Sequence, residues 1–153
     1  MKETTRIKAL FKNLYNGDPW LAITLLGTLE NITSEQAAKR AAPGMNSIWE
    51  ITNHLINWRK TVLQRVHGTV IPSPDHNYFL PVEDNSAKAW QETLKILEET
   101  QQQWEDFLQK MEDDDLQNHY PANHYTHYEH IHGIIQHDAY HLGQIALLAK
   151  HFT

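Results

Sequence analysis

Hydrophobic residues recur every three or four positions along most of the chain, which is the spacing of one face of an α-helix. The pattern predicts four main helices after a short amphipathic segment at residues 7–14. No stretch shows the sustained alternation of a β-strand. The sequence therefore predicts an all-α four-helix bundle. We place its main helices at about residues 19–29, 47–66, 85–111 and 126–152, with a brief helical turn at 33–38.

Turn and cap residues set the limits of these helices. Asp18-Pro19 has the form of an N-cap followed by a first helical residue, and Ser47 and Glu50 have the spacing of a capping box. Residues 69–82 contain three prolines and are too long for a tight hairpin. We therefore expect one domain over residues 1–153, with a long crossover connection between the second and third main helices.

Composition and charge exclude several classes of function. Thirteen Lys and Arg against nineteen Asp and Glu leave a net charge of −6, which argues against nucleic acid as a partner. The absence of cysteine removes disulfides, Cys-ligated metals and a protein thiol nucleophile. No apolar run approaches the roughly 18 residues of a membrane span, and the start of the chain is too polar for a signal peptide. We expect a cytoplasmic protein without a membrane partner.

Histidine is the unusual residue, with eleven copies, of which seven lie between positions 119 and 141. His137 and His141 stand one helical turn apart, so both imidazoles can reach one metal ion. His54 is the only histidine in the middle of another long helix, and it is the natural third ligand. At about 100° per residue, all three lie on the same-handed shoulder of their apolar stripes, where an open metal site can form.

Three neutral imidazoles suit a divalent ion, Zn or Ni in the first place, with Fe, Co or Mn as alternatives. Such a site leaves a coordination position for water or a small thiol. The alternative for each histidine is a structural role in the core or on a solvated face. A zinc-protease pattern would need Glu at Asp138, and a di-iron bundle would need a second Glu-x-x-His motif, so neither class is supported.

Several neighbouring side chains are candidates for supporting roles. Glu50 and Asn57, one turn on either side of His54, could orient its ring or handle a proton; alternatively, Glu50 is only the capping carboxylate. Tyr140 and Gln144 could hydrogen-bond a substrate or cofactor, or simply pack. His130 could line the entrance to the site. The other histidines are expected in solvent-facing or loop positions: His67, His76, His119, His124, His127, His132 and His151.

The five tryptophans divide in the same way. Trp20, Trp58, Trp90 and Trp104 have helical spacing and are expected in the core. Trp49 falls on the polar side of its helix, and we expect it to be an anchor under a loop or at a subunit interface.

Three blocks of the sequence resemble the DinB/YfiT-like superfamily. The resemblance covers nearly the whole chain in order, and its last block is the most specific part. It implies a four-helix bundle with a long crossover, a divalent metal held at His54, His137 and His141, and a homodimer. The matching blocks are Gly17-Asp18-Pro19-Trp20, then Pro43-Gly44 with Ser47-Ile48-Trp49-Glu50-Ile51, His54 and Trp58, and finally His137-Asp138-Ala139-Tyr140-His141-Leu142-Gly143-Gln144-Ile145.

Members of this superfamily include bacillithiol- and mycothiol-dependent S-transferases, a thiol-dependent isomerase and proteins described as metal-dependent hydrolases. The resemblance implies a metal-dependent enzyme that activates water or a low-molecular-weight thiol for attack on a small-molecule substrate. A thiol of this kind would come from a cofactor, so the absence of cysteine is no objection. The alternative is a non-catalytic metal-binding or stress-response protein.

Overall fold

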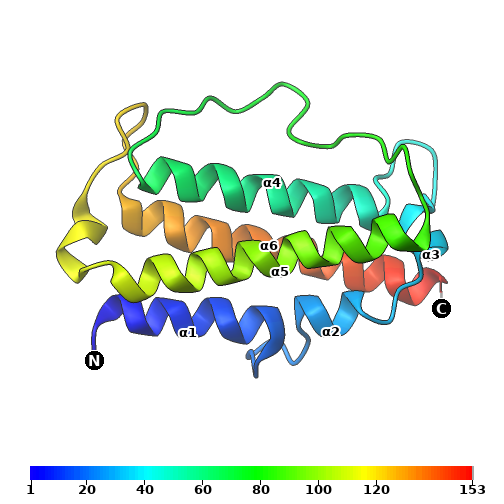
Figure 1. The fold of residues 1–153 in the computed structure, drawn as a ribbon, viewed down its shortest axis with the longest axis horizontal. Coiled ribbons are helices and arrows are strands. Elements are labelled where there is room, and N and C mark those ends of the chain that lie inside the picture. Colours follow the sequence, from blue (N-terminus) through cyan, green and yellow to red (C-terminus); the bar gives the residue numbers. More distant parts are fainter. Residues whose placement is uncertain (153) are drawn as a thin grey trace.

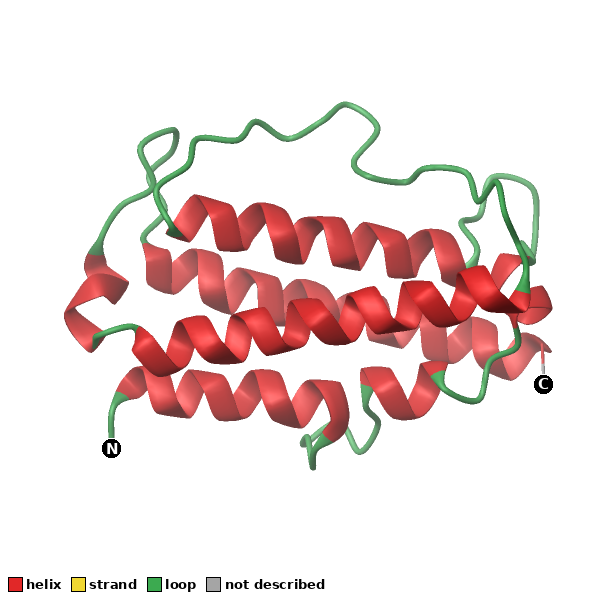
Figure 2. Ribbon diagram, viewed as in Figure 1, coloured by secondary structure: helices red, strands yellow, loops and turns green. Residues whose placement is uncertain are grey.

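The computed structural model describes residues 1–152, and over these residues it contains helices and loops but no strand (Figures 1 and 2). The predicted all-α fold is thus confirmed. Four of the helices are long, and none of the described helices is long and apolar enough to cross a membrane. In chain order the elements are α1 (Glu3–Asn16), α2 (Leu25–Leu29), α3 (Ser34–Ala38), α4 (Ile48–Val66), α5 (Ala87–Lys110), the 3-10 helix η1 (Asp113–Gln117) and α6 (His127–Phe152).

The four long helices form a bundle. Helices α1 and α4 each contact both α5 and α6. Residues 67–86 pass along the length of the bundle before α5 begins, so α4 and α5 run in the same direction (Figure 1). Helices α1 and α6 run the opposite way. The long crossover between the second and third main helices is therefore present, and it lies over α4.

The N-terminal part of the chain differs from the sequence prediction. The segment expected to be short is the long helix α1, whereas the helix expected at 19–29 is reduced to the five residues of α2. Ala22 has a φ of 63°, a left-handed conformation that a helix does not contain. Thr24 then caps α2 by accepting a hydrogen bond from the Gly27 N–H. The apolar spacing of this segment is helical, but the local backbone prevents a continuous helix.

Two tryptophans show how the core is arranged. Trp20 is 99% exposed, so the prediction that it lies in the core is wrong, because it sits in the turns before α2. Trp49 is buried, and its ring packs 5.0 Å from that of Trp90 while its Nε1 donates to Thr93 Oγ1 at 2.9 Å. It borders a hollow beneath residues 80–84 of the crossover, the position expected of an anchor under a loop.

The core consists of two apolar clusters, one at each end of the bundle. Trp90, Leu97 and Ile145 belong to the first, and Trp104 and Ile131 to the second. Polar and charged side chains are also buried, and several of them come from the middle turns of α4, α5 and α6. This central region of α4 and α6 is where the candidate site lies.

Candidate metal centre

The middle of α4 and the middle of α6 bring three imidazoles together. One ligand nitrogen from each of His54, His137 and His141 lies within 4.8 Å of the others. The Nε2 atoms of His54 and His137 are 2.9 Å apart. His54 and His141 are buried, and His137 is partly exposed. The helical angles predicted that these side chains could meet, and the packing of α4 against α6 brings them to one point.

The outer nitrogens of two rings are held by hydrogen bonds. His54 Nδ1 donates to the main-chain carbonyl of Asn77 at 2.6 Å, and His141 Nδ1 donates to Gln144 Oε1 at 2.7 Å. A carbonyl oxygen can only accept, so the proton lies on Nδ1 and the lone pair on Nε2. Tyr140 accepts a hydrogen bond from Gln144 Nε2 at 3.2 Å, which fixes the orientation of that amide. Partners of this kind orient metal-binding histidines in proteins.

Burial keeps two of these imidazoles, those of His54 and His141, neutral. Burial is the main cause that lowers the pKa of His54 to about 4, and burial also lowers the pKa of His141. Both rings are therefore uncharged near pH 7, the form in which histidine binds metal ions. Three imidazole nitrogens at this separation match the donor set that Zn and Ni prefer. The residues present thus fit a divalent metal ion.

A cavity of about 650 Å³ opens onto the three histidines. That volume suits a small molecule. Phe79 forms part of its wall and stacks on the His54 ring at 4.0 Å. Its rim carries exposed apolar side chains, those of Met45, Tyr140 and Leu147. A small molecule that enters this cavity can reach the imidazoles directly.

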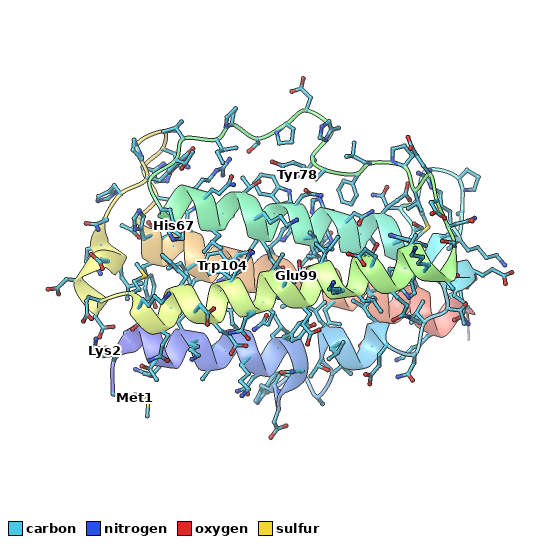
Figure 3. All side chains as sticks on the ribbon, in the orientation of Figure 1. Met1, Lys2, His67, Tyr78, Glu99 and Trp104 are labelled. Atoms are coloured by element: carbon cyan, nitrogen blue, oxygen red, sulfur yellow. The ribbon has the colours of Figure 1, made fainter. Side chains whose placement is uncertain are left out.

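The crossover connection supplies one wall of the site. Asn77 and Tyr78 have φ values of 49° and 60°, so the chain turns sharply at the point where it meets α4. Tyr78 lies on the crossover next to α4 (Figure 3). Asn77 accepts a hydrogen bond from Trp58 Nε1 at 2.8 Å through its side chain, and the Tyr78 hydroxyl lies 2.8 Å from Thr61 Oγ1. The turn thereby places the Asn77 carbonyl within hydrogen-bond distance of His54.

The sequence analysis missed this contribution of the crossover. Asn77 and Phe79 lie in the irregular connection, where hydrophobic periodicity carries no information about contacts. The tolerance of asparagine for positive φ was the one available signal, and it indicates a turn but not what the turn touches.

The side chains of Glu50 and Asn57 form their hydrogen bonds with residues other than the three histidines. Glu50 accepts hydrogen bonds from the Ser47 N–H at 2.7 Å and from Arg40, with Arg40 Nε at 3.1 Å. Burial alone would raise the pKa of the Glu50 carboxyl, yet these bonds hold it below its usual value. Asn57 donates to the carbonyl of Asn53. Glu50 is thus a capping and ion-pairing carboxylate, and its part in proton transfer stays a prediction.

A buried ion pair lies beside His137. Arg59 Nε donates to Asp138 Oδ2 at 2.8 Å, both side chains being fully buried, and Arg59 Nη1 donates to Gln101 Oε1 at 3.0 Å. Asp138 Oδ1 lies 3.9 Å from His137 Nδ1 and has no hydrogen-bond partner in the described structure. The sequence analysis considered Asp138 only as a departure from a zinc-protease pattern. Its carboxylate instead places negative charge next to the imidazoles.

The remaining histidines are spread over the molecule. His130 lines a second cavity that also contains His137, close to the position expected for an entrance residue. His127 is 9% exposed and His132 is partly buried, so the expectation of solvent-facing positions is wrong for both. His127 is the first residue of α6, where its main-chain N–H donates to the Asn118 carbonyl. The exposed ones are His67, His76, His119, His124 and His151.

Comparison with protein families now adds to this geometry. The family model of the DinB superfamily matches residues 23–145. The chain belongs to the DinB superfamily. This DinB-superfamily match includes α4, α5 and all three histidines, whereas α1 lies outside it. No curated protein and no solved structure matches the chain at a significant level. Membership in the superfamily and the buried histidine group together fit metal binding.

Proposed function

We propose that this protein binds one divalent metal ion through the Nε2 atoms of His54, His137 and His141, and that the bound form is a small-molecule enzyme. The observation that carries the proposal is the convergence of three imidazoles, two of which, those of His54 and His141, already have their outer nitrogens hydrogen-bonded. Asn77 and Gln144 hold two of the rings so that their Nε2 lone pairs remain for the ion.

The residues around the site favour catalysis at the metal ion over storage of the ion. Within the described residues only three His, Asp or Glu side chains converge there, and a set of three ligands leaves a coordination position open. The cavity of about 650 Å³ gives a substrate access to that position. Zn and Ni fit the donor set first, with Fe, Co and Mn as alternatives, and an ion of this class lowers the pKa of a ligated water or thiol.

The chain itself then has to bind and orient the reactants. Tyr140, at the rim of the cavity, presents a hydroxyl that Gln144 already holds by a hydrogen bond. The apolar wall of Phe79 and Leu148 suits the carbon skeleton of a substrate. Because the protein has no cysteine, a thiol would have to come from a low-molecular-weight cofactor of the bacillithiol or mycothiol type. The reaction is therefore a hydrolysis by water or an S-transfer from such a thiol.

Metal binding is tested by titration calorimetry and elemental analysis of the purified protein. Wild-type protein should bind about one Zn²⁺ or Ni²⁺ per chain. His137→Ala and His54→Ala should lose this binding, whereas His67→Ala, at an exposed position outside the lining of the cavity, should retain it. Binding that survives in His137→Ala would remove the basis of the proposed site. A homodimer is also proposed, and light scattering of the same samples tests it.

Activity is tested on metal-loaded protein with an electrophilic substrate, in the presence and absence of a small thiol. Turnover that requires the thiol supports the S-transferase, and turnover without thiol supports the hydrolase. His54→Ala is the negative control in both cases. If the loaded protein shows neither reaction, the non-catalytic metal-binding or stress-response role replaces the enzyme.

A further inference from the structure

A second cavity adjoins the metal centre on the other side of His137. Its volume is about 930 Å³, and it lies between α4, the crossover and the first turns of α6. His137 and Asn77 line both this cavity and the one that opens onto the three histidines. A molecule in the second cavity therefore lies next to the metal centre without occupying the space in front of it.

Arg65 provides a buried positive charge at this cavity. It is only 8% exposed, and no carboxylate of the described residues lies within ion-pair distance of it. A buried charge without a counter-charge is costly to a folded protein. Such a guanidinium is suited to bind an anion, because its planar donors match carboxylate and phosphate oxygens.

The guanidinium is also held in a fixed orientation. Its Nε and Nη2 atoms donate to the carbonyl of Ile71 at 3.0 and 2.7 Å, and Nη2 is 3.3 Å from Ser73 Oγ. The rings of Trp58 and Tyr120 contact it at 5.4 and 5.3 Å. None of these hydrogen bonds involves Nη1. A rigid cation with a spare donor loses little entropy when it binds an anion.

Other lining residues can add hydrogen-bond donors. His130 and His132 line the cavity, and the Nε2 atom of each is buried without a hydrogen-bond partner. Burial first, and then the charge of Arg65, lower the pKa of His130, so this ring is neutral and carries a single N–H. The acidic side chain in the lining, Glu129, accepts hydrogen bonds from the Thr126 N–H and hydroxyl, which engage one of its oxygens.

We propose that the cavity between Arg65 and His137 binds the anionic group, a carboxylate or a phosphate, of the small molecule that reacts at the metal centre. This inference rests on the proposed function, and it adds the class of reactant. Arg65 binds the anion, and Trp58, which contacts both Arg65 and His137, forms the wall between the anion and the metal centre. The apolar rim of the first cavity then remains for the second reactant.

The wild-type protein gives the first test. Zn²⁺-loaded protein with ¹⁵N-labelled histidine is titrated with inorganic phosphate and, separately, with succinate. We expect the side-chain resonances of His130 and His132 to shift, whereas those of His67 and His151 stay unchanged. A response to phosphate alone identifies a phosphoryl group, and a response to succinate alone identifies a carboxylate. If neither anion shifts His130, the inference is wrong. Metal-free protein is titrated in parallel, to exclude that the anion acts by binding directly to Zn²⁺.

Substitution of Arg65 gives the second test. Arg65→Gln should weaken binding of the responding anion at least tenfold, and Arg65→Lys should weaken it less because the charge remains. Lys60→Gln, an exposed cation on the same helix, is the matched control and should bind as wild type. Equal anion affinity in wild type and Arg65→Gln overturns the inference. If Arg65→Gln does not fold, the anion affinity of Arg65→Lys and the shifts in the wild-type spectra decide whether the inference holds.

Zn²⁺ affinity is measured on the same samples. A wild-type protein that binds Zn²⁺ tightly but neither anion contradicts only the anion site. A wild-type protein that binds an anion through Arg65 but does not bind Zn²⁺ contradicts only the proposed function. The two proposals can therefore fail separately.

Discussion

His54 Nδ1 donates a hydrogen bond of 2.6 Å to the main-chain carbonyl of Asn77, and this bond joins the centre of α4 to the crossover. Residues 23 positions apart thus determine which nitrogen of His54 faces the site. The connection between α4 and α5 is a part of the metal centre and not merely a link between helices. The consequences can be tested at both residues and at their neighbours.

Asn77→Ala should weaken Zn²⁺ binding several-fold. The substitution keeps the carbonyl but removes the acceptor of Trp58 Nε1, and it puts alanine at a φ of 49°, which costs about 1–2 kcal/mol. Asn77→Gly removes the same side chain without that backbone cost, so it should bind Zn²⁺ more tightly than Asn77→Ala. Competition with a chromophoric chelator measures both. Equal affinities in the two variants would show that the left-handed turn has no influence on the site.

Gln144→Leu should lower Zn²⁺ affinity by about 10–100-fold, because His141 Nδ1 loses its acceptor and the ring can rotate or change tautomer. Gln144→Glu retains an acceptor oxygen, so its Zn²⁺ affinity should fall much less. Gln102→Leu changes an exposed glutamine on α5 and serves as the control. Chelator competition again provides the measurement, and a Gln144→Leu protein with wild-type affinity would contradict the role given to this amide.

Asp138→Leu should reduce the free energy of unfolding of the metal-free protein by about 3–5 kcal/mol, because it leaves Arg59 buried without its counter-charge. The double variant Arg59→Met with Asp138→Leu removes both charges and should recover most of the loss. Guanidinium unfolding followed by circular dichroism gives the three values. Losses that simply add in the double variant would show that the two side chains are not coupled.

The metal-free protein should lose stability as the pH falls from 7 to 5. Burial lowers the pKa of His54 from its ordinary 6.5 to about 4, and burial also lowers the pKa of His127, His130 and His141. Below pH 6.5 the unfolded chain therefore binds protons that the folded chain does not, so stability declines until the folded pKa is reached.

For His54 alone this loss amounts to at most about 3 kcal/mol by pH 4. Denaturant unfolding at pH 7, 6 and 5 measures the part of this loss that falls between pH 7 and 5, above the range in which carboxylates with lowered pKa values, such as Glu50 and Asp113, titrate. A free energy of unfolding that stays constant over this range would contradict neutral, buried imidazoles.

Much of the helical architecture could be predicted because each long helix repeats its apolar residues on one face. The long crossover was predicted from prolines and length, and the capping box at Ser47 and Glu50 was predicted from spacing. The segment at 19–29 was predicted wrongly. Its apolar spacing is helical, but the left-handed Ala22 and the Thr24 cap belong to a turn that periodicity does not report.

The sequence by itself determined that His137 and His141 share one face of a helix, because a helix of about 3.6 residues per turn brings positions four apart to the same side on neighbouring turns. It also determined that His54 lies at the edge of the apolar stripe of its own helix. Only the tertiary structure decided that these two shoulders meet, and that Asn77, Phe79 and Arg65 lie around them. Contacts between segments depend on how helices pack and where a loop crosses, and local spacing holds no information about either.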